Sequence, residues 1–474
     1  MRSLTATLLG RDSVDADADF FRLGGDSILA VQLAARAQAA GVPVGPKDVF
    51  AHQSPRALAR TVQGRVRAAA VPARPSQEPG PLEPTPVVEW LASLGGDAGG
   101  FAQSVVVPLP ATATGATVRT ALQRLVDHHD ALRLRRTAVQ GGRWELEVRP
   151  PGTVPAGELL RHVDLAREGA DDPAACDELI EQERRAARRH LDPDRGDVVR
   201  AVLFHGREDR LLLVIHHLAV DGVSWRVLLP DLELAHRHAL RGEHAALPPV
   251  PTPLRAWTRA LRTAARSEAV RADETWWRTR LAAPHAGLGS RPLDPASDTV
   301  DRAGRLSSTW DETWIEPLLT AVPAAFRARV PEILLAALSL ALRRWSGNPQ
   351  GAPVRVDLEG HGRRPGLAGL ADLDLSRTVG WFTTLHPVLL DPPPATGSPA
   401  EVSARAVTHV KERLREVPHD GLTTGCCARR AAARRPRPAG LQLPRPLRHR
   451  GPRPLAPAAR FAARRGPASP SPIP

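Results

Sequence analysis

Cysteine is scarce in this 474-residue chain, and long apolar runs are absent from it. Three cysteines (Cys176, Cys426 and Cys427) cannot build a disulfide framework in a chain of this length, and no metal-ligand spacing accompanies them. No apolar run approaches the roughly 20 residues of a transmembrane helix, and the N-terminal residues lack the pattern of a secretory signal. We therefore expect a cytoplasmic protein with reduced cysteines.

Acidic residues and lysine are missing from residues 426–474, which contain twelve arginines. This segment contributes +12 to the formal net charge of +13, so residues 1–425 carry a net charge of only +1. A nearly neutral body excludes nucleic acid as an expected partner. Arginine, proline and alanine account for 34 of these 49 residues, a composition typical of a disordered tail.

Residues 1–65 have the pattern of a small all-α unit. LGGDSI precedes an alanine-rich helix that is expected to start near Ser27 and to end before Gly41 in a left-handed cap. A hydroxyl that follows two glycines at a helix N-terminus is exposed, and this end of a helix favours an added phosphodiester. The proline-rich residues 66–86 predict a semi-rigid linker.

Strand-like and helix-like segments alternate over residues 87–425, which predicts α/β organisation. The apolar run at 211–215 is typical of a buried strand, and HHLAVDG follows it directly. Side chains alternate along a strand, so only one of His216 and His217 can face a given cavity. An imidazole fixed at the end of a buried strand can shuttle a proton near neutral pH.

Two other interpretations compete for this motif. A histidine pair beside Asp221 is most often a hydrogen-bonded core pair. A metal site at His216, His217 and Asp221 is disfavoured, because zinc sites of the helical HExxH type place their histidines four residues apart on one helix face. We therefore expect no metal site. Ser224 is expected to cap the helix that follows.

HHLAVDG with the following VSWRVLLPDL resembles the signature of the condensation superfamily of nonribosomal peptide synthetases, and more narrowly its epimerization branch. VDLEGHGR at 356–363 and DLSRTVGWFT at 374–383 resemble the same branch, in the order that the family shows. The resemblance covers about residues 82–420 and implies a two-lobed α/β fold similar to chloramphenicol acetyltransferase, with a channel between the lobes. FFRLGGDSI resembles the attachment motif of peptidyl carrier proteins, which implies 4′-phosphopantetheine on Ser27.

The resemblance also implies a catalytic pair. Inversion of an α-carbon takes a proton from one face and returns one to the other, so a group that alternates between acid and base is required near each face. The family's motif positions assign these roles to His217 and Glu359, and which of them takes the first proton stays open. Enclosure in the channel would raise the pKa of the Glu359 carboxyl group.

Neighbouring residues are expected to support this pair. Asp221 is expected to be an ion-paired organiser of its loop, and His216 to face away from the channel and support the fold. Gly222 and Gly360 are expected to permit tight turns. His128 and His129, near the end of the first helix of this region, are expected to be structural, because nothing beside them completes a catalytic set.

A second group of residues follows the other two motifs. Arg377, Thr378 and Trp381 are expected to line or brace the channel, although a core position is the better interpretation of Trp381. His361 and Arg363 either bind the phosphate of the arm or are surface polar residues.

The resemblance stops near Gly421. The family continues with stretches similar to YGLLR and FNYLGRF, and neither is present here. GC-rich codons for these strings, read in shifted frames, give residues like those at 424–428 and 442–448. We therefore expect a disturbed reading frame, an incomplete second lobe and a disordered tail at 426–474, and the nucleotide sequence decides this point.

The expected function is L-to-D epimerization of an aminoacyl or peptidyl thioester on phosphopantetheine. Two alternatives stay open: a peptide-bond-forming condensation domain, in which His217 assists attack of an amine on a thioester, and a carrier module beside an inactive domain. The expected partners are upstream adenylation and downstream condensation modules and a phosphopantetheinyl transferase, without nucleic acid or membrane.

Overall fold

The computed structural model follows most of the chain. The residues that it describes are 1–25, 27–42, 44–63, 79–94, 98–140, 143–170, 172–244, 246–285, 294, 302, 304, 306–345, 353–363, 367, 369–370, 373–391 and 396–433. Among the helices of this part of the chain, none combines the length and the hydropathy that a membrane span requires.

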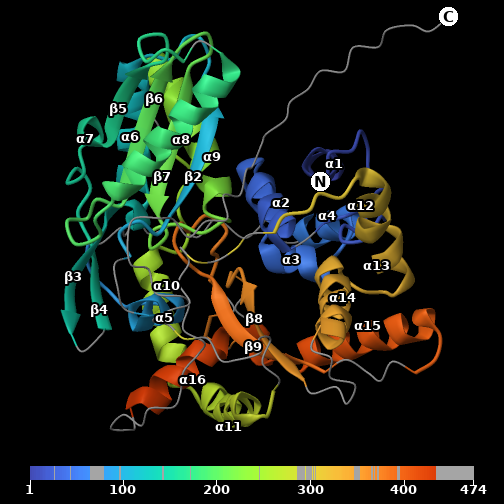
Figure 1. The fold of residues 1–474 in the computed structure, drawn as a ribbon. Helices are drawn as coiled ribbons and strands as arrows, with labels where there is room; N and C mark the ends of the chain where they lie inside the picture. Colours follow the sequence, from blue (N-terminus) through green and yellow to red (C-terminus); the bar gives the residue numbers. More distant parts are fainter. Residues whose placement is uncertain are drawn as a thin grey trace, which may run out of the picture.

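The N-terminal residues form a small all-α unit, as the sequence predicts (Figure 1). Phe20, Leu33 and Leu58 are fully or almost fully buried in its core. Gly41 ends the second helix with φ +75°, which confirms the expected left-handed cap. The helices of this unit are α1 (Arg2–Leu8), α2 (Ser27–Ala39), α3 (Pro46–Ala51) and α4 (Pro55–Gln63).

The first lobe of the α/β unit is built on a sheet with the strand order β2-β7-β6-β5. Leu211, Leu213 and Ile215 of β7 pack in the same cluster as residues of α6 and α9, whereas Leu212 and Val214 pack with residues of α8. Both faces of the sheet are therefore covered, which explains why this strand is apolar throughout. The elements of this layer are β2 (Ala102–Pro108), α6 (Gly115–His128), α7 (Ala156–Leu159), β5 (Leu160–Asp164), α8 (Pro173–Arg189), β6 (Val199–His205), β7 (Arg210–His216) and α9 (Trp225–Leu240).

The expected linker at 66–86 is too long at its C-terminal end. Leu82 is buried, and residues 80–82 form a strand that pairs with β4, so this part of the segment belongs to the folded unit. Residues 64–78 lie outside the described residues. The second sheet has the order β1-β4-β3, with β1 (Gly80–Leu82), β3 (Leu134–Gln140) and β4 (Arg143–Val148), and α5 (Pro86–Leu94) follows β1.

The second lobe contains an antiparallel pair of strands against which two helices pack. Ile333 and Ala336 of α14 are buried, but Leu334 and Leu338 on its other side are 49% and 40% exposed, so α14 is covered on one face only. The elements are α12 (Glu312–Leu319), α13 (Ala321–Ala325), α14 (Val330–Trp345), β8 (Val354–Gly360), β9 (Thr384–Leu390) and α15 (Pro399–Arg415). Helices α10 (Leu254–Ala264) and α11 (Glu268–Ala282) lie between the lobes in sequence.

The expected start of the disordered tail at residue 426 is wrong. Helix α16 (Leu422–Ala433) packs against α5 and α11, and the side chains of Cys426 and Cys427 are buried. A Cβ atom on Gly425 would lie 2.2 Å from Cβ of Pro86, so the helix approaches α5 at a distance that only glycine permits. Small residues allow this packing, which the overall composition of the segment conceals. Residues 434–474 lie outside the described residues.

Candidate active site

Strand pairing orients the two histidines of HHLAVDG in opposite directions. The backbone N–H of His216 donates to the carbonyl oxygen of Val198, and that of His217 donates to the carbonyl oxygen of Phe101, each at 2.8 Å. The His216 ring is fully buried: its Nε2 donates to the carbonyl oxygen of Ala98 at 2.7 Å, and its Nδ1 accepts from the N–H of Leu218 at 3.1 Å. Both nitrogens of His216 are thus committed to backbone groups.

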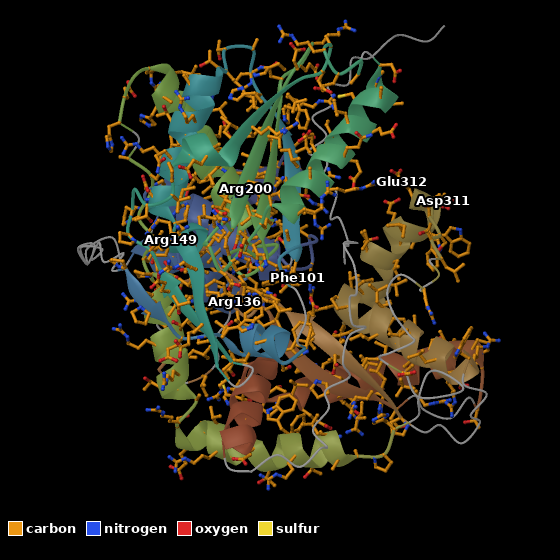
Figure 2. All side chains as sticks on the ribbon, turned by 60° about the vertical axis from the view of Figure 1, so that its left-hand side comes forward. Phe101, Arg136, Arg149, Arg200, Asp311 and Glu312 are labelled. Atoms are coloured by element: carbon orange, nitrogen blue, oxygen red, sulfur yellow. The ribbon has the colours of Figure 1, made fainter. Side chains whose placement is uncertain are left out.

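The imidazole of His217 lies between two aromatic rings from different lobes. It stacks on Phe101 with a centroid distance of 4.7 Å and an interplanar angle of 9°, and Trp381 approaches it to 4.5 Å. Phe101, labelled in Figure 2, and Trp381 also contact each other, so His217 lies where the first lobe meets the segment that leads into β9. Trp381 is 5% exposed, as a core position requires, and it forms one wall of the imidazole site at the same time.

A glutamine outside the sequence motifs contacts this imidazole. Gln103 on β2 lies with its Nε2 2.9 Å from Nε2 of His217, and its Oε1 accepts from the indole N–H of Trp225 at 2.8 Å. Gln103 is one of two polar residues in β2, and its partner follows only from the β2–β7 register, which pairs Gln103 with Ile215.

Burial controls the charge of His217. It lowers the pKa of the imidazole below its ordinary value, although Asp221 and the carbonyl groups of His217 itself and Val220 act in the opposite direction. Nδ1 is buried and makes no hydrogen bond to any residue that the structure describes. The ring is therefore neutral near pH 7, so one of its two nitrogens carries the proton and the other carries a lone pair.

Asp221 and Arg363 form a buried ion pair between the lobes. Nη2 of Arg363 lies 2.9 Å from Oδ1 and 3.1 Å from Oδ2 of Asp221, and the two side chains are 1% and 6% exposed. The N–H of Phe382 donates to Oδ2 of Asp221 at 3.3 Å, and the guanidinium group stacks 4.0 Å from the centroid of the Phe382 ring. Asp221 has the environment of an ion-paired organiser.

This ion pair excludes both roles that the sequence analysis left open for Arg363. Its side chain is neither a surface group nor free to bind the phosphate of an arm. Ser224 also differs from the expectation: it precedes α9, but its hydroxyl makes no capping bond. It instead donates to Asp221 at 2.8 Å and accepts from the N–H of Gly380 at 3.2 Å, because a buried carboxylate with several acceptor sites attracts nearby donors.

The glycine requirement in these turns differs from the one that we expected. Gly222 has no atom within 4 Å of a built Cβ, and neither Gly222 nor Gly360 has a positive φ. Gly362 has φ +65°, and its Cβ would lie 1.7 Å from the carbonyl oxygen of Phe382. The turn that requires glycine is thus two residues later than the one at Gly360.

A second buried network lies beneath α9. Asp231 of α9 accepts from Nη2 of Arg377 at 2.6–2.8 Å and lies 2.9 Å from Nε2 of His129, whose side chain is buried. Arg377 therefore braces α9. Among the described residues, His128, His129 and Asp231 form the one group with ligand atoms within 4.8 Å of one another, but the guanidinium group at Asp231 opposes a cation there.

Glu359 does not lie in an enclosed channel in this structure. Its side chain is exposed on β8, opposite Leu385 in the register with β9. No hydrogen bond or ion pair involves Glu359 within the described part of the chain, and none joins it to His217. The expected enclosure is wrong because the elements around β8 that the structure describes leave this face of the strand uncovered.

Two glycines form the tight turn that precedes α2. Ser27 is the first residue of this helix, and its side chain lies outside the described residues. Gly24 has φ +100°, and a Cβ on Gly25 would lie 2.4 Å from a ring carbon of Phe20. Glycine at both positions lets the chain turn tightly into the helix N-terminus, where free N–H groups suit a phosphodiester on Ser27.

Family models match both parts of the chain. The phosphopantetheine attachment site model matches residues 1–62, and the condensation domain model matches residues 90–434. The chain belongs to the condensation-domain family. It combines a condensation-superfamily domain with a carrier domain, and it is homologous to nonribosomal peptide synthetase subunits.

Synthetase relatives match nearly the whole chain. A linear gramicidin synthase polypeptide of Brevibacillus parabrevis is 35% identical over 425 residues, which is 88% of this chain and 8% of the relative. Chondramide synthase of Chondromyces crocatus is 32% identical over 434 residues, which is 89% of this chain and 10% of the relative. The chain thus spans a small fraction of the length of these relatives.

Solved condensation-superfamily structures confirm the two-lobed α/β fold similar to chloramphenicol acetyltransferase. The epimerization domain from the third module of tyrocidine synthetase B superimposes with a TM-score of 0.62 at 29% identity, over 74% of each chain. The X-domain from teicoplanin biosynthesis superimposes with a TM-score of 0.57 at 20% identity, over 75% of this chain and 74% of that chain, which supports the fold alone.

The carrier domain of this condensation-family chain carries covalently attached 4′-phosphopantetheine. The turn before α2 and the N-terminus of this helix fit the group, and Ser27 would hold it. When bound, the arm supplies a thiol that carries the acyl substrate as a thioester.

Proposed function

We propose that this chain epimerizes the α-carbon of an aminoacyl or peptidyl thioester on its phosphopantetheine arm, with His217 and Glu359 as the acid–base pair. The observation that carries the proposal is the neutral imidazole of His217, held between Phe101 and Trp381 with a lone pair on one ring nitrogen. The 29% identity to the epimerization domain of tyrocidine synthetase B supports this branch of the superfamily over the others.

In this mechanism the two side chains exchange protons with the α-carbon from opposite faces. His217 accepts or returns a proton through its lone pair, and Glu359 performs the complementary transfer. Asp221 and His216 hold the loop that carries the imidazole, while Arg377 and Trp381 support it from the second lobe. Upstream and downstream synthetase modules and a phosphopantetheinyl transferase are the partners that such a segment would use.

Solvent exchange of the α-proton tests the proposal. The full chain, loaded at Ser27 with an L-aminoacyl phosphopantetheine, is placed in deuterated water, and deuterium at the α-carbon and the D-to-L ratio of the released amino acid are measured. We expect exchange and D-product, with a loss of about 10²–10⁴-fold in His217→Gln and in Glu359→Gln.

Each alternative has its own outcome. Amide formation with an added acceptor, without α-proton exchange, would replace epimerization by condensation. Attachment of the arm to Ser27 with neither exchange nor amide formation would leave a carrier domain beside an inactive one. Both variants are compared with the parent chain by circular dichroism, so that loss of activity is separated from loss of fold.

A further inference from the structure

Gln103 bridges the indole of Trp225 and the imidazole of His217. An indole N–H can only donate a hydrogen bond, so the oxygen of the Gln103 amide faces Trp225, with Nε1 and Oε1 2.8 Å apart. The amide nitrogen then faces His217, 2.9 Å from its Nε2. An amide NH₂ group can only donate, so Nε2 of the neutral imidazole is the acceptor in this contact.

The other groups around the ring do not oppose this arrangement. Phe101 and Trp381, the two aromatic rings that contact the imidazole, are uncharged. Among the described residues that influence the His217 charge, Asp221 is the one ionised group, and it is already paired with Arg363. Gln103 therefore supplies the hydrogen-bond donor that faces Nε2, and Trp225 orients the Gln103 amide.

We propose that Gln103 is a positioning residue that keeps His217 neutral, with its proton on Nδ1 and its lone pair on Nε2. For its kinetic consequence, this inference rests on the proposed function. A second proton on Nε2 would place two donors face to face. Rotation of the amide would relieve that contact only by turning its NH₂ group onto the indole N–H, so Trp225 opposes it. Gln103 and Trp225 thus hold His217 as a neutral imidazole of one tautomer before substrate arrives.

The tautomer of His217 gives a readout that needs no substrate. The full chain is labelled with ¹⁵N-histidine, and long-range ¹H–¹⁵N correlation spectra are recorded between pH 5 and 8, with His217→Gln identifying the signal. We expect the Nδ1–H tautomer in the parent chain. In Gln103→Glu the carboxylate accepts from both partners, so Nε2 becomes protonated and the pKa of His217 rises by at least about one pH unit.

Two further variants separate positioning from a general effect on the fold. Trp225→Phe keeps an aromatic ring but removes the indole N–H, so the amide is free to rotate and both tautomers are expected. Gln182→Glu makes the same charge change on the exposed surface of α8, and it is expected to leave the His217 signal unchanged. Unfolding midpoints in denaturant are measured for all variants.

The outcomes are distinct from those of the exchange assay. An Nε2–H tautomer in the parent chain, or an unchanged His217 signal in folded Gln103→Glu, would overturn the inference. If the tautomer is as expected but the parent chain shows no α-proton exchange, the proposed function fails and the role of Gln103 in holding the ring stands. If the tautomer and the α-proton exchange are both as expected, the acidic limb of the pH–rate profile for exchange moves to higher pH in Gln103→Glu.

Discussion

The two residues proposed to exchange protons with the substrate lie in very different surroundings. His217 of the first lobe stacks on Phe101, contacts Trp381 and is bonded to Gln103, whereas Glu359 of the second lobe lies exposed on β8. The first lobe covers its sheet on both faces, and the second covers α14 on only one. The surroundings of His217 thus fix its side chain before substrate binds. The position of the Glu359 carboxylate depends on what covers β8.

The largest change in stability is expected from the ion pair between Asp221 and Arg363, which joins the two lobes. Arg363→Met leaves the carboxylate of Asp221 buried without its counter-charge, and we expect the free energy of unfolding to fall by about 3–5 kcal/mol in denaturant titrations. The double variant Asp221→Asn/Arg363→Met removes both charges and is expected to recover part of that loss. Equal stability of Arg363→Met and the parent chain would contradict the buried pair.

The turns at Gly222 and Gly362 provide a matched pair. Gly362→Ala introduces a Cβ that meets the carbonyl oxygen of Phe382 in a backbone conformation that disfavours side chains, so we expect a loss of about 3 kcal/mol or more. Gly222→Ala meets no atom within 4 Å and is expected to change stability by less than about 1 kcal/mol. Thermal unfolding of both variants measures the difference, and similar losses would mean that the turns are equivalent.

Acid is expected to weaken the first lobe through its buried histidines. Burial lowers the pKa of His128 to about 4, below the unfolded value near 6.5, so the unfolded chain binds more protons between these pH values. This contribution to stability is complete above about pH 6.5 and is lost as the pH falls towards 4. For His128 it amounts to at most about 3 kcal/mol.

Urea titrations from pH 8 to 4 measure this dependence. His128→Gln is expected to flatten the curve between pH 6.5 and 4, and His190→Gln, which changes an exposed histidine, gives the baseline. An unchanged slope in His128→Gln would show that His128 is not the group that responds to acid.

The smallest effect is expected at Glu359. Because its side chain is exposed and makes no hydrogen bond within the described residues, Glu359→Ala should change the free energy of unfolding by less than about 0.5 kcal/mol. His217→Ala removes a ring that contacts Phe101 and Trp381 and should cost about 1–3 kcal/mol. A large loss in Glu359→Ala would indicate that the carboxylate is enclosed in solution.

Local pattern predicted much of the first lobe and little of the contacts between lobes. The run at 211–215 identified β7 because a strand buried on both faces is apolar throughout, and alternation along a strand separated the roles of His216 and His217. The partner of Gln103 could not be predicted, because it depends on how β2 and β7 align across more than a hundred intervening residues.

Burial in the second lobe was harder to predict. Arg363 contacts groups from two other segments, at 221–224 and 375–382, so no local pattern distinguishes it from a surface arginine. Glu359 was assigned to an enclosed channel from its motif alone, but exposure depends on which elements cover β8. Helix α16 was missed because the arginine-rich composition of the tail hides a short stretch of small residues that pack closely.

The salt link between Asp221 and Arg363 also bears on how a tethered substrate enters. Parting the lobes at this point would break the two hydrogen bonds of the pair and the hydrogen bond from Phe382 to Asp221, and it would let water solvate both charges. A tethered substrate that enters while this contact stays closed therefore breaks none of these bonds.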